Sequence, residues 1–206
     1  MADICVGMPM KDIVDLKMFK MAIGVKFDLS QSYVLSPDVN DGFFNAVFKA
    51  RLKNGDDCEL KVKIGNEDHP IMQNVYNLAF GPPGDLGEID DRALLQYENP
   101  SRVFSTLLQH ALFYFDEFPG RSLGIDGSTN NRAYLYYRLL QRNYDMLSQH
   151  FKVYGVKYYV RISRYGKSQY DNPFDFTDIF SDLNLIKKGE RIEGDLMYNY
   201  FVLKQK

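Results

Sequence analysis

The chain has 206 residues, of which 45% are hydrophobic and 25% are charged. These fractions match ordinary globular domains and exclude a disordered chain, and a chain of this length buries a core without disulfides or metals. The formal net charge of -2 is not the basic excess typical of a nucleic-acid binder. We expect a single domain, 1–206, in which residues 1–35 form a weakly patterned N-terminal extension.

The chain carries no pattern for export or membrane insertion. No apolar run approaches the roughly 20 residues that span a bilayer, and acidic residues interrupt the apolar N-terminal stretch, unlike a signal peptide. The two cysteines, Cys5 and Cys58, have no CxxC partner and are too few for a disulfide framework. We therefore expect a cytoplasmic protein with reduced thiols and no membrane partner.

The first half of the chain predicts antiparallel strands. Residues 43–64 hold two runs of nearly alternating apolar and polar residues on either side of Asn54-Gly55. This dipeptide is favoured in tight hairpin turns, because both positions tolerate a positive φ. Residues 75–80 predict a third strand, and the loop after it is rich in glycine and proline.

Two helices are predicted in the middle of the chain. Residues 101–118 have a helical apolar stripe, preceded by cap residues and ended by Pro119-Gly120. Residues 130–149 predict the second helix, and residues 122–126 predict a short strand between the two. The stripe of the first helix consists of Phe104, Leu108, Ala111, Leu112 and Phe115.

The last part of the chain predicts two more strands. Residues 151–165 indicate a strand that is broken or bulged at Gly155. Residues 166–197 mix turn residues with short apolar clusters and predict a long irregular excursion with one helical turn, and residues 197–206 predict a final strand that pairs back into the sheet. The fold class is therefore α+β, a mixed, mainly antiparallel sheet with two main helices packed on one face.

The turn before the second predicted helix is a candidate anion site. Gly127, Ser128 and Thr129 lead into a helix N-terminus, where free N–H groups and the helix dipole favour anions, and Arg132 follows in the first turn. The alternative is an ordinary start of a helix, in which Ser128 or Thr129 caps, Gly127 makes the turn and Arg132 is solvated. The pattern is neither a P-loop nor a dinucleotide fingerprint.

Other polar groups are candidates for a nucleic-acid surface or a metal site. Arg138 and Arg142 are typical of a surface for single-stranded nucleic acid, together with Tyr134, Tyr137 and Tyr158. The alternative is a solvated helix face in which Arg142 pairs with Asp145. The three histidines are isolated in sequence, which argues against zinc. The acidic residues of the loop at 85–91 match no known metal-loop spacing. We expect no cofactor and no metal.

Several short motifs follow one another in a fixed order: YNLAFG, an acidic turn with EIDD, a helix ending in EFP, GST with an arginine three residues later, then LY and FKVYG. In this order and spacing, residues 75–206 resemble a domain-of-unknown-function family common in Bacteroidetes. Gly127, Ser128, Thr129, Arg132, Leu135 and Tyr136 match the family pattern, whereas Asn130, Asn131, Ala133 and Tyr134 depart from it. The resemblance implies that the turn with Arg132, together with Tyr136, matters for the fold or for a ligand.

Two functional hypotheses follow. The first is a non-enzymatic interaction module, an accessory or antitoxin-like component that binds a protein partner or a second copy of itself. It is motivated by 15 Tyr and 15 Phe and by the lack of any catalytic motif. The second is a nucleotide or nucleic-acid phosphate binder, with hydrolase or transferase chemistry, that uses the Gly127-Ser128-Thr129 turn and Arg132. Sequence alone leaves open whether the protein is an enzyme.

Overall fold

The computed structural model describes residues 24–38, 44–84, 88–90, 93, 95–127, 129–162 and 174–206. The strands are β1 (Ser36–Pro37), β2 (Ala46–Arg51), β3 (Asp57–His69), β4 (Met72–Gly81), β5 (Ser122–Asp126), β6 (Phe151–Ile162), β7 (Phe174–Leu185) and β8 (Tyr200–Gln205). The helices are α2 (Pro100–Glu117), α3 (Asn130–Arg142), α4 (Tyr144–His150) and the 3-10 turn η1 (Gly194–Leu196).

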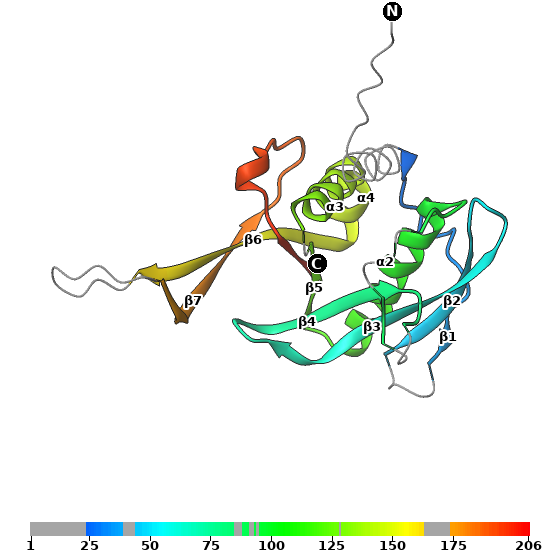
Figure 1. Ribbon diagram of the computed structural model, residues 1–206, viewed down its shortest axis with the longest axis horizontal. Coiled ribbons are helices and arrows are strands. Elements are labelled where there is room, and N and C mark those ends of the chain that lie inside the picture. The colour runs from blue at the N-terminus through cyan, green and yellow to red at the C-terminus, as the bar shows by residue number, and fades with distance from the viewer. Residues whose placement is uncertain are drawn as a thin grey trace, which may run out of the picture.

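All eight strands belong to one sheet, in the order β1-β2-β3-β4-β5-β8-β6-β7. Only β4 and β5 pair in parallel; the other neighbouring strands are antiparallel. The helices α2, α3 and α4 cover strands of the sheet (Figure 1). Their side chains share one apolar core with those strands. The predicted α+β class, with a mixed and mainly antiparallel sheet, is confirmed.

The hairpin predicted at Asn54-Gly55 is present between β2 and β3. Gly55 has a φ of 91°, and its N–H donates to the carbonyl of Leu52 at 3.0 Å. The next strand is longer than predicted, because β3 continues to His69 and pairs with β4 in a second hairpin. The alternation stops after Ile64 at a register shift, so sequence alone does not indicate this extension.

The first predicted helix is confirmed as α2. The Asn99 side chain accepts a hydrogen bond from the Arg102 N–H at 3.0 Å, and Pro100 lies in the first turn. The apolar face of α2 is buried against β2, β3 and β4 in the main core. Buried core residues of this helix include Val103, Leu107, Leu108, Ala111 and Phe115.

The second predicted helix is interrupted at Asn143, which separates α3 from α4. The side chain of Asn143 is buried and forms hydrogen bonds with backbone groups. The amide Nδ2 donates to the Leu139 carbonyl at 2.9 Å, and Oδ1 accepts from the Phe27 N–H at 2.8 Å. The prediction of one helix over residues 130–149 is therefore wrong at this residue, because the Asn143 side chain hydrogen-bonds to a segment that is distant in sequence.

That distant segment, residues 24–35, is called the strap. It lies against α2, and Val25 is fully buried. Of the predicted N-terminal extension, residues 1–23 lie outside the described residues. The strap attaches to α2 by backbone N–H groups of Lys26, Asp28 and Tyr33, which donate to the hydroxyls of Ser101, Ser105 and Thr106 at 2.8–3.0 Å.

The predicted irregular excursion at residues 166–197 is wrong for residues 174–185, which form β7 and pair with β6. The apolar alternation of β7 changes phase between Phe176 and Ile179, so no single alternating pattern covers the strand, and its strand character comes from pairing with β6. The predicted helical turn corresponds to η1. Residues 163–173 of this stretch lie outside the described residues.

The expected break at Gly155 is also wrong, since β6 runs through it in register with Asn184 on one side and Phe201 on the other. The irregularity lies further on, between Val160 and Arg161. Gly155 is needed for a different reason. A Cβ at this position would lie 2.1 Å from Cδ2 of the Tyr198 ring, which packs directly on the backbone.

We predict that Gly155→Ala destabilises the fold by about 1–3 kcal/mol, because the new methyl group forces the buried Tyr198 ring away from the sheet. Gly194→Ala is the matched control, since a Cβ there meets nothing within 4 Å. Urea unfolding of both variants measures the difference. Equal stability of the two variants would show that the ring relaxes without cost.

Candidate functional site

Gly127 of the predicted anion site packs tightly. Its N–H donates to the Asn199 carbonyl at 2.8 Å. A Cβ at this position would lie 2.9 Å from the Ala133 Cα and from the Asn199 oxygen. The glycine therefore allows the start of α3 to approach the residue before β8, and its N–H is already used within the chain.

Thr129 is the N-cap of α3. Its hydroxyl accepts from the Arg132 N–H at 3.3 Å, and its own N–H donates to the Gly127 carbonyl. Tyr136, one turn later, is half-buried against the core. Ser128, the remaining member of the predicted site, lies outside the described residues. Three backbone donors of this turn thus have partners inside the protein.

The aromatic residues of α3 do not all face solvent. Tyr137 is buried, and its hydroxyl donates to the Glu190 carbonyl at 2.6 Å. Burial is also the first cause that raises the pKa of Tyr137. The predicted basic and aromatic surface of Arg138 and Arg142 therefore lacks this ring.

Exposed aromatic side chains gather instead on the outer part of β6 and β7. β8 pairs with β6 only as far as Val156. Beyond it, β6 and β7 form a two-stranded projection, residues 157–162 and 174–182, called the arm (Figure 1). Six of the ten exposed large hydrophobic side chains in the described part of the chain lie on it: Tyr158, Tyr159, Ile162, Phe174, Phe176 and Phe180.

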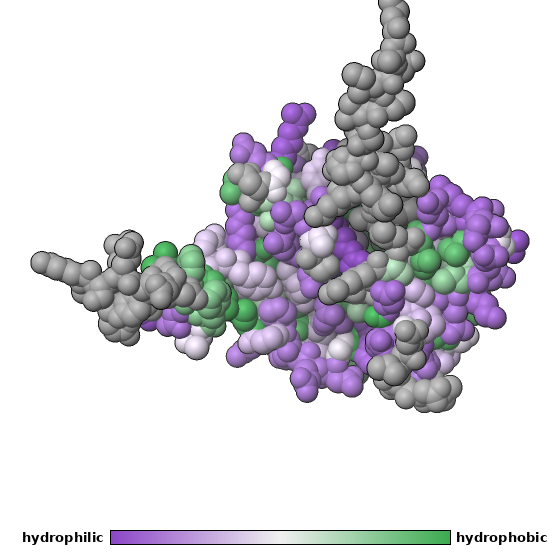
Figure 2. Space-filling view, viewed as in Figure 1, coloured by the Kyte–Doolittle hydropathy of each residue, from purple (hydrophilic) through white to green (hydrophobic). Residues whose placement is uncertain are grey.

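These side chains form a surface at the far end of the molecule, where Figure 2 shows hydrophobic residues beside mainly polar ones. Phe176 is 62% exposed and Phe180 is 56% exposed. The Phe180 ring stacks on Tyr159 with 5.1 Å between centroids. An exposed apolar group of this kind on a polar protein is typical of an interaction site.

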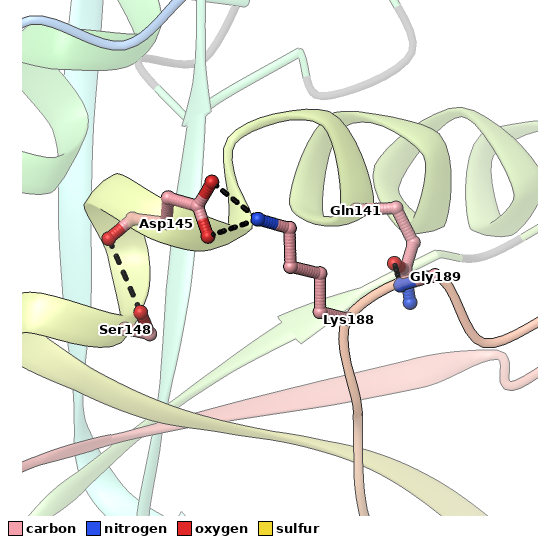
Figure 3. A network of polar contacts seen from close by, with 5 residues as sticks. All are labelled: Gln141, Asp145, Ser148, Lys188 and Gly189. Carbon is pink, nitrogen blue, oxygen red and sulfur yellow. Dashed lines mark hydrogen bonds and ion pairs between the residues drawn. The ribbon is translucent and has the colours of Figure 1, made fainter.

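The base of the arm is held to α3 and α4 on one side (Figure 3). Lys188, just after β7, forms an ion pair with Asp145 at 2.6 Å. The Gly189 N–H donates to Gln141 Oε1 at 2.8 Å, and Gln141 Nε2 donates to the Lys187 carbonyl at 2.8 Å. Together with the Tyr137–Glu190 bond, these contacts fix the segment that leaves β7.

A second contact holds the arm to the β3–β4 hairpin. Tyr158 Oη lies 3.1 Å from His69 Nε2, and the two rings stack at 5.9 Å, although the residues are 89 positions apart in sequence. The His69 ring also packs 5.0 Å from Tyr200 of β8. The strands β4, β5 and β8 lie between β3 and β6 in the sheet order, so the sheet must curl strongly for these side chains to meet.

The hydrogen bonds of His69 determine its neutral form. Nδ1 accepts from the Ile71 N–H at 3.2 Å, so the proton of the neutral ring is on Nε2 and is donated to Tyr158. Burial lowers the pKa of His69, and burial followed by the charge of Asp126 raises the pKa of Tyr158 to about 12. Both groups are thus neutral near pH 7.

The described residues hold no group of three or more His, Cys, Asp or Glu side chains suited to a metal ion. None of the helices in this part of the chain combines the length and the apolar content that a bilayer crossing needs. Cys58, the cysteine within the described residues, is a partly buried free thiol.

The fold and the arm define an α+β protein with an exposed aromatic projection at one end of a curled sheet. The chain belongs to DUF6934, a family of unknown function, whose match covers residues 40–177. The match begins before the region of the resemblance, at residue 40, and ends within β7. No curated protein and no solved structure matches the chain.

We predict that stability falls as the pH drops from 7.5 to 5. Burial lowers the pKa of His69 and of His110, whose Nε2 lies 2.8 Å from the Phe44 carbonyl. Histidines of the unfolded chain have a pKa of about 6.5. As the pH falls through this value, the unfolded chain binds more protons than the folded protein, so acid favours unfolding.

The double variant His69→Asn/His110→Gln keeps the acceptor toward Ile71 and the donor toward Phe44 but does not titrate. We expect its unfolding free energy to change much less over the same pH range, as measured by urea unfolding at each pH. An unchanged pH slope in the double variant would contradict the assignment of both histidines.

Proposed function

We propose that the protein is a non-enzymatic interaction module, an accessory or antitoxin-like component that binds a protein partner through the arm. The observation that carries the proposal is the exposure of Tyr159, Phe174, Phe176 and Phe180 on one projecting hairpin. Aromatic side chains are enriched in protein interfaces and contribute much of their binding energy.

The attachment of the arm supports the same proposal. Its base is held by Lys188 and Glu190 on the helix side and by His69 on the other side. A surface that is ordered before binding loses less conformational entropy when a partner docks. A bacterial, cytoplasmic setting with reduced thiols is part of the proposal and rests on the family resemblance and on a sequence with only two cysteines, neither in a CxxC motif.

The test compares an arm variant, Phe176→Ser/Phe180→Ser, with Phe113→Ser, a control whose phenylalanine is 53% exposed on α2. Each tagged protein is purified from its native cells, co-purifying proteins are quantified, and the candidate partner is reconstituted from pure components. We expect the arm variant to bind at least about 30-fold more weakly, the loss of one interface hot spot. If the partner binds the wild type, the arm variant and the Phe113→Ser control equally, the interface does not include the arm.

The alternative is a nucleotide or nucleic-acid phosphate binder, with hydrolase or transferase chemistry, at the turn of Gly127, Thr129 and Arg132. It is less well supported, because the N–H groups of all three residues have partners within the chain. An incoming phosphate would have to displace them or rely on other donors.

We predict that inorganic phosphate, nucleotides and short RNA or DNA leave the melting temperature unchanged, whereas Thr129→Ala lowers stability by about 1 kcal/mol through loss of the cap. A ligand at 100 times its Kd would instead add about 2.7 kcal/mol. A rise in melting temperature that corresponds to this free energy, and that is lost in Arg132→Ala, would favour the phosphate-binding alternative over the interaction module.

A further inference from the structure

β7 is the last strand of the sheet order, so one edge of it faces away from the sheet. Residues 179–185 pair with residues 154–160 of β6 without a register shift. The preceding stretch bulges, since Asp175 pairs with Arg161 whereas Ile179 pairs with the neighbouring Val160. The regular part of this edge is therefore residues 179–185, and the bulge limits how far another strand can extend along it.

The side chains of this segment differ between its two faces. Ile179, Leu183 and Leu185 alternate with a single serine on one face. Phe180 and Asp182 lie next to each other on the opposite face, and Asn184 follows them. A strand added to this edge would place its residues directly opposite, at a Cβ separation of about 5 Å.

The charge of β7 has one sign. It carries Asp175, Asp178 and Asp182 and no lysine or arginine. The neighbouring cations belong to β6, on the inner side: Lys157 is opposite Asp182, and Arg161 forms a 3.1 Å ion pair with Asp178. Within residues 179–185 the charged side chain is Asp182, so a strand on the outer side favours lysine or arginine opposite it and disfavours a carboxylate.

A second copy of the chain does not provide this complement through the same edge. In-register antiparallel pairing of two 179–185 segments would place Asp182 of one copy opposite Asp182 of the other, again without a cation from either β7. This charge pattern disfavours self-pairing and favours a different, basic strand.

Taking the proposed function as its basis, we propose that a partner protein adds an extended segment to residues 179–185 of β7, as a further strand of the sheet. The segment alternates apolar residues, which meet Ile179, Leu183 and Leu185, with an aromatic residue opposite Phe180 and a lysine or arginine opposite Asp182. Main-chain hydrogen bonds bind the segment, and the alternate side chains select it.

The first experiment uses the peptide Val-Thr-Val-Lys-Thr-Tyr-Val-Arg, which has this pattern for antiparallel addition. Its binding is measured by fluorescence anisotropy, and amide hydrogen exchange of the whole protein locates it. We expect slower exchange in β7 and no change in β2 and β3. Replacing both Thr with Pro should abolish binding, and replacing Lys and Arg with Glu should weaken it roughly tenfold.

The matched protein variant is Asp182→Lys, which should reverse the preference so that the Glu peptide binds more tightly than the basic one. Asp116→Lys, at an exposed position of α2, is the control and should retain the wild-type preference. Circular dichroism checks that both variants fold.

The inference is overturned if the basic peptide leaves β7 exchange unchanged at millimolar concentration, or if the basic and Glu peptides bind equally. The proposed function fails separately, when no partner depends on Phe176 and Phe180. A partner that needs these phenylalanines but does not slow exchange in β7 would retain the interaction module and reject strand addition.

Discussion

The whole architecture depends on the double pairing of β8. This strand lies between β5 and β6 and hydrogen-bonds to both, so it joins the sheet of β1 to β5 to the pair of β6 and β7. Its residues Tyr200, Phe201, Val202 and Leu203 are all buried. Phe201 and Leu203 face the helices, and Tyr200 and Val202 pack on the opposite face with a second small cluster. Removing this one strand would leave two separate pieces, each with an exposed edge.

The parts of the fold that could be predicted are those with a local signal. Asn54-Gly55 and the alternation around it define a hairpin, and the stripe and cap of α2 define a helix. The final strand could be predicted as well, because its apolar run is buried on both faces. The interruption at Asn143 and the strand β7 could not, since each is stabilised by residues distant in sequence.

The candidate site shows the same division. Sequence composition indicates many aromatic residues for a surface but cannot assign each to the inside or the outside. Tyr114 and Tyr137 are buried, whereas Phe174 and Phe176 are exposed. The contact of His69 with Tyr158 depends on the curl of the sheet over three intervening strands, and no local pattern encodes it.

The contacts that hold the base of the arm differ in physical character. The Lys188–Asp145 pair is exposed and contributes little in salt solution. The Tyr137 hydroxyl bond to Glu190 is partly buried and persists in salt, as does the stack of His69 on Tyr158. The position of the arm is therefore set mainly by neutral contacts, and changes in ionic strength act on the charges of its surface more than on its orientation.

The attachment of the strap determines which positions tolerate mutation. The strap contributes backbone N–H groups, and the side-chain oxygens that accept from them belong to Ser105, Thr106 and Asn143. The side chains needed for this attachment therefore lie outside the strap. Most surface positions of the strap can therefore change freely in a sequence library. Substitutions such as Ser105→Ala would instead be depleted, although this serine lies inside a helix where alanine has the higher intrinsic propensity.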